Sequence, residues 1–134
     1  MYNTSSLFDI GTEIVVLTGV SGQIGVEYAK ALLVNGAKVA GLDLHTSEMS
    51  DKLLEKYPDK YIFYTVDITN KESLEASLKK IQNDFGNPSV LINNAALDSP
   101  PSADAMENGP FETYPESSLD KVLDVNLKGT FLCC

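Results

Sequence analysis

Short apolar segments alternate with longer segments of helical period along this chain of 134 residues. The apolar segments are rich in β-branched side chains and are bounded by glycine, proline or polar residues, which is typical of buried strands. They cover residues 13–18, 37–44, 61–66 and 89–93. Because such an alternation is the pattern of successive β-α units on a parallel sheet, it predicts an α/β fold.

Three helices are predicted between these strands. The first covers residues 23–35 and ends at Gly36, and its stripe of helical spacing consists of Ile24, Tyr28, Ala31, Leu32 and Asn35. In the second, the residues that share a face are Met49, Leu53, Leu54 and Tyr57. The third has Thr69 or Asn70 as its N-cap and ends at Gly86, and its stripe consists of Leu74, Leu78, Ile81 and Phe85.

A long segment without periodicity, residues 97–115, separates the fourth strand from a last helix. Connections of this length are often functional, so the segment either folds over a substrate or is an insertion without catalytic consequence. Ser117 or Ser118 is the expected N-cap of the last helix. Its apolar residues lie all around the helix, so we expect it to be buried on more than one side. They are Leu119, Val122, Leu123, Val125, Leu127, Phe131 and Leu132.

The order of elements, βαβαβαβα, fits one domain over residues 1–134. Right-handed crossovers between parallel strands predict a doubly wound sheet with the strand order 3-2-1-4.

Composition and charge exclude several classes of function. Ten lysines, no arginine and 19 acidic residues give a net charge of −9, which disfavours binding to nucleic acid. No segment approaches the roughly 20 apolar residues that span a bilayer, and residues 1–9 lack the pattern of a secretion signal, so we expect a cytoplasmic protein that does not bind membranes. The only cysteines are the adjacent Cys133 and Cys134, and His45 is the only histidine. Neither a disulfide framework nor a metal site is predicted.

A glycine-rich turn lies where the first strand ends and the first helix begins. It reads Thr-Gly-Val-Ser-Gly-Gln-Ile-Gly over residues 18–25. Glycines let the backbone approach a pyrophosphate, and the free N–H groups at the start of a helix bind its charge. Asp43 lies at the end of the second strand. Its separation in sequence from the glycine-rich turn is close to the roughly 20 residues expected for the acid that binds an adenosine ribose. The carboxylate of Asp43 repels a 2′-phosphate, and the chain has no arginine to bind one. The glycine-rich turn and Asp43 together therefore favour NAD over NADP.

With these residues placed, the chain resembles the short-chain dehydrogenase/reductase family, classical branch, over its whole length. Residues 8–11 (FDIG) look like the lead-in to the first strand of that family. Residues 67–69 (DIT), 93–96 (NNAA) and 125–131 (VNLKGTF) look like three of its later motifs, in the family's order and spacing. The resemblance implies a Rossmann-type fold truncated to its cofactor-binding half.

The resemblance also assigns roles. Asp67 would contact the adenine ring edge, the segment 93–96 would lie along the cofactor, and Asn126 would take part in a catalytic proton relay. The residues expected to bind NAD are Gly19, Ser21, Gly22, Gln23, Ile24, Gly25, Asp43, Leu44, Asp67, Ile68, Asn93 and Ala95. The family's catalytic tyrosine and lysine would lie beyond residue 134. The full-length form is expected to be a homo-oligomer that acts on a small-molecule substrate.

Two features depart from the family pattern. The classical turn is T-G-x-x-x-G-x-G, whereas here Gly22 takes the fifth place and Gln23 the sixth. This spacing resembles the extended branch, but that branch usually has a His-x-Ala-Ala segment where this chain has residues 93–96. The second departure is Ala96, where glycine is usual and where a methyl group narrows the nicotinamide end of the site.

Three hypotheses of function remain open. The leading one is an NAD-dependent oxidoreductase that moves hydride between the nicotinamide and a carbinol or carbonyl carbon. The alternatives are an extended-branch nucleotide-sugar epimerase or dehydratase and a non-catalytic NAD-binding module. A methyltransferase of similar fold would not account for Asn93, Asn94 and Asn126 together.

Overall fold

The computed structural model describes residues 8–98 and 102–134. Residues 99–101, which belong to the predicted long loop, therefore lie outside the described part. Within it, four strands form one parallel sheet in the order β3-β2-β1-β4, which confirms the predicted topology. The strands are β1 (Ile14–Thr18), β2 (Lys38–Asp43), β3 (Tyr61–Thr65) and β4 (Val90–Ile92).

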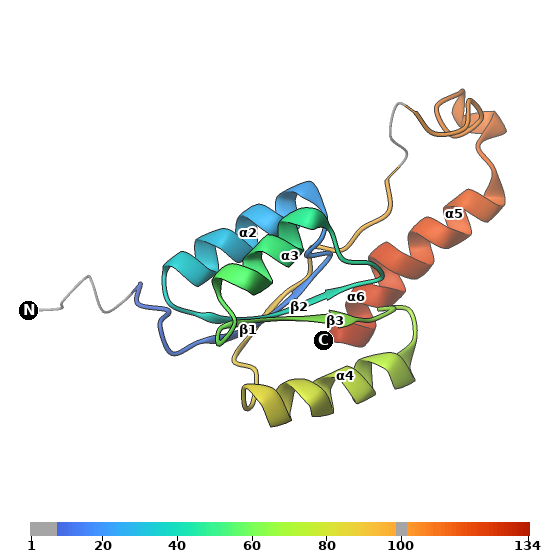
Figure 1. Ribbon diagram of the computed structural model, residues 1–134. Helices are drawn as coiled ribbons and strands as arrows, with labels where there is room; N and C mark the ends of the chain where they lie inside the picture. The colour runs from blue at the N-terminus through green and yellow to red at the C-terminus, as the bar shows by residue number, and fades with distance from the viewer. Residues whose placement is uncertain (1–7, 99–101) are drawn as a thin grey trace, which may run out of the picture.

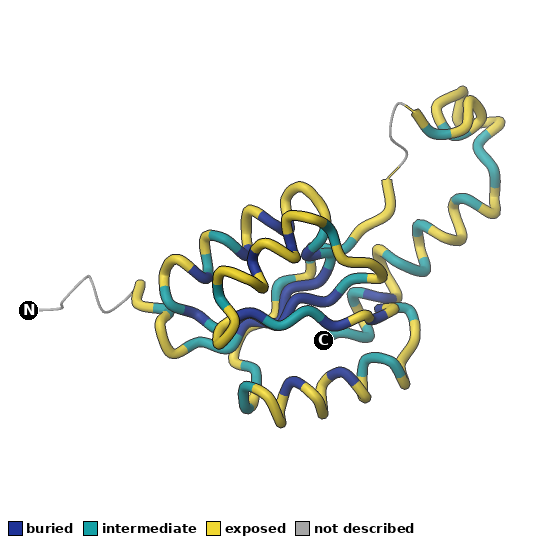
Figure 2. The backbone as a smooth tube through the Cα atoms, viewed as in Figure 1, coloured by how far each residue is buried: buried dark blue, intermediate teal, exposed yellow. Residues whose placement is uncertain are grey.

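The sheet is the middle of three layers (Figure 1). Helices α2 (Gln23–Val34) and α3 (Glu48–Lys56) cover one face, and α4 (Lys71–Asp84) lies on the other, next to the short α6 (Thr130–Cys133). Successive strand residues point to opposite faces, so Leu17 packs under α2 and α3 whereas its neighbour Val16 packs toward α4. The buried residues concentrate in the strands and on the helix faces turned toward them (Figure 2).

Helix α2 contacts the sheet through a different face from the one its apolar spacing predicts. The buried residues are Gly25, Val26, Ala29 and Leu33, whereas Ile24 is 62% and Tyr28 46% exposed. The predicted stripe is therefore wrong. The reason is steric, because the small side chains at positions 25 and 29 let the helix approach β1 and the glycine-rich turn closely. The close approach of α2 to the sheet, rather than the apolarity of its side chains, therefore decides which helix face is buried.

The starts of the helices differ in how their N–H groups are satisfied. Ser47 caps α3 by accepting from the N–H of Ser50. Asn70, one of the two residues predicted to cap the next helix, caps α4 by accepting from the N–H of Ser73. Helix α2 begins after Gly22 with no side-chain cap and with no acidic residue in its first turn. No side chain of its own cap or first turn therefore counters its N-terminal dipole.

The last helix corrects two sequence predictions. It begins at Glu116 after Pro115 rather than at a serine cap, since the hydroxyl of Ser118 bonds the carboxylate of Glu107 instead. It runs as α5 (Glu116–Leu123), a π-helical segment η2 (Asp124–Gly129) and α6. A short 3-10 turn, η1 (Phe111–Thr113), precedes it.

The expected burial of this helix on several sides is also wrong. No residue of α5 is buried, and Phe131 in α6 is 75% exposed. Figure 1 shows the reason, since α5 extends away from the sheet and only the end of the helix lies next to the other layers. Within the described residues, Leu119, Leu123, Leu127 and Phe131 are exposed, whereas Val122, Val125 and Leu132 are partly buried.

Candidate functional site

The largest hollow of the described residues, about 660 Å³, lies at the carboxyl ends of the strands. The loops that follow β1, β2, β3 and β4 all contribute to its walls. In a doubly wound sheet this end, where the crossovers diverge, is the usual site of ligand binding. Its lining residues are Gly19, Ser21, Gly22, Gln23, Ile24, Gly25, Leu42, Asp43, Leu44, His45, Thr46, Ser47, Val66, Asp67, Ile68, Asn94, Ala95, Ala96, Leu97 and Val125.

The protein's own packing requires two of the glycines in the turn after β1. Gly19 has φ +67°, and a Cβ there would lie 2.7 Å from the Cα of Ala95. At Gly25 a Cβ would lie 2.1 Å from the carbonyl oxygen of Gly19, a distance that no arrangement tolerates. These two glycines therefore fix how closely the turn, helix α2 and the segment after β4 approach one another.

The carboxylate of Asp43 connects the second strand to the glycine-rich turn. Its Oδ2 accepts from the N–H of Ser21 at 2.9 Å, and its Oδ1 accepts from the N–H of Leu44 at 2.8 Å. Each oxygen keeps a further lone pair, so the carboxylate can still accept from a ligand hydroxyl. The two backbone donors fix its orientation toward the hollow.

The hydroxyl of Ser21 is the one buried side-chain polar atom of the described residues that has no hydrogen-bond partner. Buried hydroxyls are normally bonded, so an unpaired one beside a hollow indicates a partner outside the chain. Its neighbours in the hollow are the uncapped first turn of α2 and Asp43. This turn is therefore prepared for an anion with adjacent hydroxyl groups.

Thr18 and Asn94 join the ends of β1 and β4. The Thr18 Oγ1 accepts from the N–H groups of Asn94 and Ala95, both at 3.0 Å. The Asn94 Nδ2 donates to the carbonyl oxygens of Thr18 and Gly19 at 3.1 and 3.0 Å. The wall formed by residues 94–96 is thereby attached to the turn that it faces.

On the other side of this wall, the π-helical segment η2 fixes two loops of the site. Asn126 accepts from the N–H of Leu97 through Oδ1 at 2.7 Å and donates to the carbonyl oxygen of Leu97 through Nδ2 at 2.9 Å. A Cβ at Gly129 would lie 2.8 Å from Ile68, so the helix passes directly against the loop after β3. The Asp67 Oδ1 in that loop accepts from the N–H and hydroxyl of Thr69.

The structure brings most of the predicted site residues together. All the residues expected to bind the cofactor line the hollow except Asn93, whose Nδ2 lies 3.6 Å from the Sγ of Cys134. Asn126 does not line it either and contributes through Leu97. The hollow is also lined by residues that sequence reasoning did not name as site residues, among them His45, Thr46, Ser47, Leu97 and Val125. The first three directly follow the segment of Asp43 and Leu44, so extending that motif along the loop would have found them.

The charge around the hollow is acidic or neutral. Asp43 and Asp67 contribute carboxylates, and no lysine is among the residues that line it. Behind the β2 wall, Tyr61 is fully buried and its hydroxyl bonds the Ser50 hydroxyl at 2.5 Å. Burial raises the pKa of Tyr61, and Asp43 adds to the shift in the same direction. The tyrosine therefore stays neutral beneath the site.

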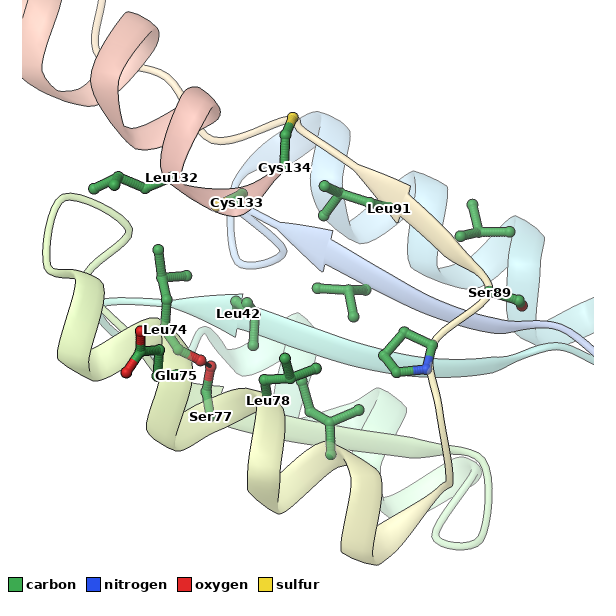
Figure 3. A pocket seen from close by; sticks show the side chains of 14 residues that line it. Leu42, Leu74, Glu75, Ser77, Leu78, Ser89, Leu91, Leu132, Cys133 and Cys134 are labelled. Atoms are coloured by element: carbon green, nitrogen blue, oxygen red, sulfur yellow. Dashed lines mark hydrogen bonds between the residues drawn. The ribbon is translucent and has the colours of Figure 1, made fainter.

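A second hollow, of about 340 Å³, lies between α4, the sheet and the end of α6 (Figure 3). Leu42, Leu74, Leu78 and Leu91 point into it, and none of the residues predicted to bind a ligand lines it. In residues 8–98 and 102–134 no cluster of three or more His, Cys, Asp or Glu side chains is arranged to hold a metal ion. None of the helices described has the length and apolar character needed to cross a membrane.

Comparison with known proteins gives a family match over most of the chain. The family model described as "short chain dehydrogenase" matches residues 13–134. Similar curated proteins include the 2-(R)-hydroxypropyl-CoM dehydrogenase of Xanthobacter autotrophicus, 29% identical over 92% of this chain and 48% of that protein. The NAD-dependent glycerol dehydrogenase of Listeria innocua is 30% identical over 93% of this chain and 46% of that protein. The chain thus spans about half the length of the curated relatives it matches.

Solved structures agree on the fold. A short-chain dehydrogenase/reductase described as a glucose/ribitol dehydrogenase, from Brucella melitensis, superposes with a TM-score of 0.79 at 23% identity, over 95% of this chain and 51% of that one. A short-chain dehydrogenase from Streptomyces avermitilis gives a TM-score of 0.76 at 25% identity, over 90% of this chain and 41% of that one.

Proposed function

Because this chain belongs to the short-chain dehydrogenase family, we propose that it forms the NAD-binding half of an oxidoreductase. The bound nicotinamide would exchange hydride with a carbinol or carbonyl carbon of a small substrate. The observation that carries the proposal is the hollow at the carboxyl ends of the strands, where an uncapped helix start, an unpaired hydroxyl and an oriented carboxylate meet.

The residues of the hollow fit a dinucleotide. The first turn of α2 and the Ser21 hydroxyl offer donors to a pyrophosphate, which carries negative charge and accepts hydrogen bonds. Asp43 offers acceptors to the adenosine ribose hydroxyls, and Asp67 and Ile68 form the wall expected to meet the adenine. Leu97 and Ala96 lie toward the nicotinamide end in this assignment.

The preference for NAD over NADP follows from charge. A 2′-phosphate beside Asp43 would place two like charges at close range, and no lysine lines the hollow to offset them. The names of two relatives are consistent with this choice, namely the NAD-dependent glycerol dehydrogenase and a 15-hydroxyprostaglandin dehydrogenase [NAD(+)] from Macaca fascicularis. The relatives named here are dehydrogenases, so the epimerase or dehydratase alternative is not favoured.

Asn126 belongs to the proposal as a residue of the catalytic relay, although its side chain bonds the backbone of Leu97. We place the activity in the cytoplasm and expect the full-length form to be a homo-oligomer. Neither a nucleic acid nor a membrane is part of the proposed function.

A comparative titration of the purified protein with NAD and NADP tests the proposal. We expect NAD to bind at least about tenfold more tightly, and we expect Asp43→Ala to reduce that ratio. Asp59→Ala is the matched control, because Asp59 precedes β3 at the opposite end of the sheet and should leave the ratio unchanged. Tighter binding of NADP by the unaltered protein would show that the role assigned to Asp43 is wrong.

A further inference from the structure

Gly22 is the glycine of the turn that the protein's own structure does not require. Its φ of −71° and ψ of 165° are extended values that any residue adopts. A Cβ built on it would meet only the carbonyl oxygen of Gly19, at 3.4 Å, which is an ordinary van der Waals distance. Gly19 and Gly25, in contrast, are required by conformation and by close packing. Neither the backbone conformation nor the packing of the protein therefore explains why residue 22 has no side chain.

The neighbouring Gln23 is the other residue that departs from the classical spacing. It is the first residue of α2, it is exposed, and it lines the hollow together with Gly22. Within the described residues its carboxamide makes no hydrogen bond. Its N–H donors are thus available on the side of the turn where the buried Ser21 hydroxyl also lacks a partner.

We propose that, relative to the classical spacing T-G-x-x-x-G-x-G, the fifth and sixth places of this turn have exchanged roles: the fifth is the bare glycine and the sixth carries the side chain. The pyrophosphate of NAD passes over the bare backbone of Gly22, and the carboxamide of Gln23 donates a hydrogen bond to one of its oxygens. A carboxamide suits this place because it is a neutral donor in a turn without acidic side chains. This assignment rests on the proposed function and identifies which residues of the turn make its pyrophosphate contacts.

Substitution at Gly22 tests the first part of the assignment. Gly22→Ala and Gly22→Ser should fold with an unchanged or slightly raised melting temperature, because the backbone conformation suits either residue. Their affinity for NAD should fall at least about tenfold, since the new Cβ occupies the path of the pyrophosphate. Adenosine, which has no phosphate, is the control ligand, and its binding followed by NMR chemical shifts should change less than about twofold.

Restoring the classical spacing provides a test by rescue. The double variant Gly22→Ser/Gln23→Gly moves the glycine back to the sixth place, so the pyrophosphate can pass over residue 23 instead of residue 22 and the serine hydroxyl replaces the lost carboxamide donor. It should bind NAD within about threefold of the unaltered protein. Gln23→Gly alone should lose about fivefold in NAD affinity through the missing donor, with no loss toward adenosine. Gln23→Glu should lose more than Gln23→Gly, and added salt should reduce the difference because the extra loss is charge repulsion.

The outcomes separate this assignment from the function it rests on. If Gly22→Ser binds NAD as tightly as the unaltered protein, or if Gln23→Gly loses nothing, the exchange of roles is wrong while NAD binding stands. If the unaltered protein does not bind NAD, the proposed function fails and this assignment fails with it.

Discussion

Replacing Thr18 with valine removes one hydroxyl and nearly nothing else. Thr18 is 1% exposed, and its Oγ1 accepts from the N–H groups of Asn94 and Ala95. Valine has the same shape, so Thr18→Val leaves both N–H groups without a partner where water has little access. The variant therefore measures the contribution of the junction between the ends of β1 and β4.

The expected loss follows from the two orphaned donors. A buried donor that loses its acceptor costs about 1–3 kcal/mol. Because these two hydrogen bonds are only partly buried, the cost of each lost bond lies toward the lower end of that range. The free energy of unfolding should therefore fall by about 2–4 kcal/mol in total. At about 2.1 cal/mol/K of unfolding entropy per residue, the chain's 134 residues give about 0.28 kcal/mol/K. The melting temperature should accordingly fall by roughly 7–14 °C.

Urea unfolding followed by circular dichroism measures this loss. Thr18→Ser is the matched control, because it keeps the hydroxyl and loses a single methyl group, which costs about 1 kcal/mol. The midpoint should move further for valine than for serine, with the same dependence on urea in all three proteins. A valine variant as stable as the unaltered protein, or more stable than the serine variant, would refute the role of these hydrogen bonds.

Three further predictions concern other parts of the chain. Gly25→Ala should lose more than about 3 kcal/mol of stability or fail to fold, because its Cβ would lie 2.1 Å from a backbone oxygen, and thermal unfolding beside Gly22→Ala measures the contrast. Burial, reinforced by the carboxylate of Asp84, raises the pKa of Tyr64, so the folded protein holds a proton that the unfolded chain releases near pH 10. Stability should therefore fall as the pH rises above about 10, and Tyr64→Phe should lose less between pH 9 and pH 11 in urea titrations. Purified residues 1–134 should produce no substrate-dependent NADH with a panel of alcohols, because no tyrosine in this sequence is followed four residues later by lysine; turnover above a protein-free control would contradict this.

The sequence was most informative where one physical requirement dominates. Strands of a parallel sheet are short, largely apolar and separated by helical segments, so all four strands and their order could be predicted. Close backbone approach demands glycine, which made Gly19 and Gly25 recognisable in advance. Asn70 was identifiable as a cap because short polar side chains before an apolar stripe commonly bond the first turn.

Prediction failed where the outcome depends on neighbours that one segment does not specify. The contact face of α2 is set by how closely Gly25 and Ala29 approach the sheet, and an apolar stripe carries no information about that distance. The exposure of Leu127 and Phe131 depends on what lies beside the last helix, which its own periodicity does not reveal. The pairing of Asn126 with Leu97 joins residues on either side of a long loop, so no local pattern announced it.

The pairing of Asn126 with Leu97 also affects how the protein can evolve. The hollow is lined up to Leu97 and again from Val125, and none of the described residues between these two contributes to its wall. Because Asn126 holds Leu97 from the far side, the wall is complete at the point where the intervening segment begins. We therefore expect substitutions in the described segment before α5, residues 102–115, to leave the wall of the hollow unchanged. Related proteins can accordingly differ in this segment and still keep the same wall beside the proposed cofactor site.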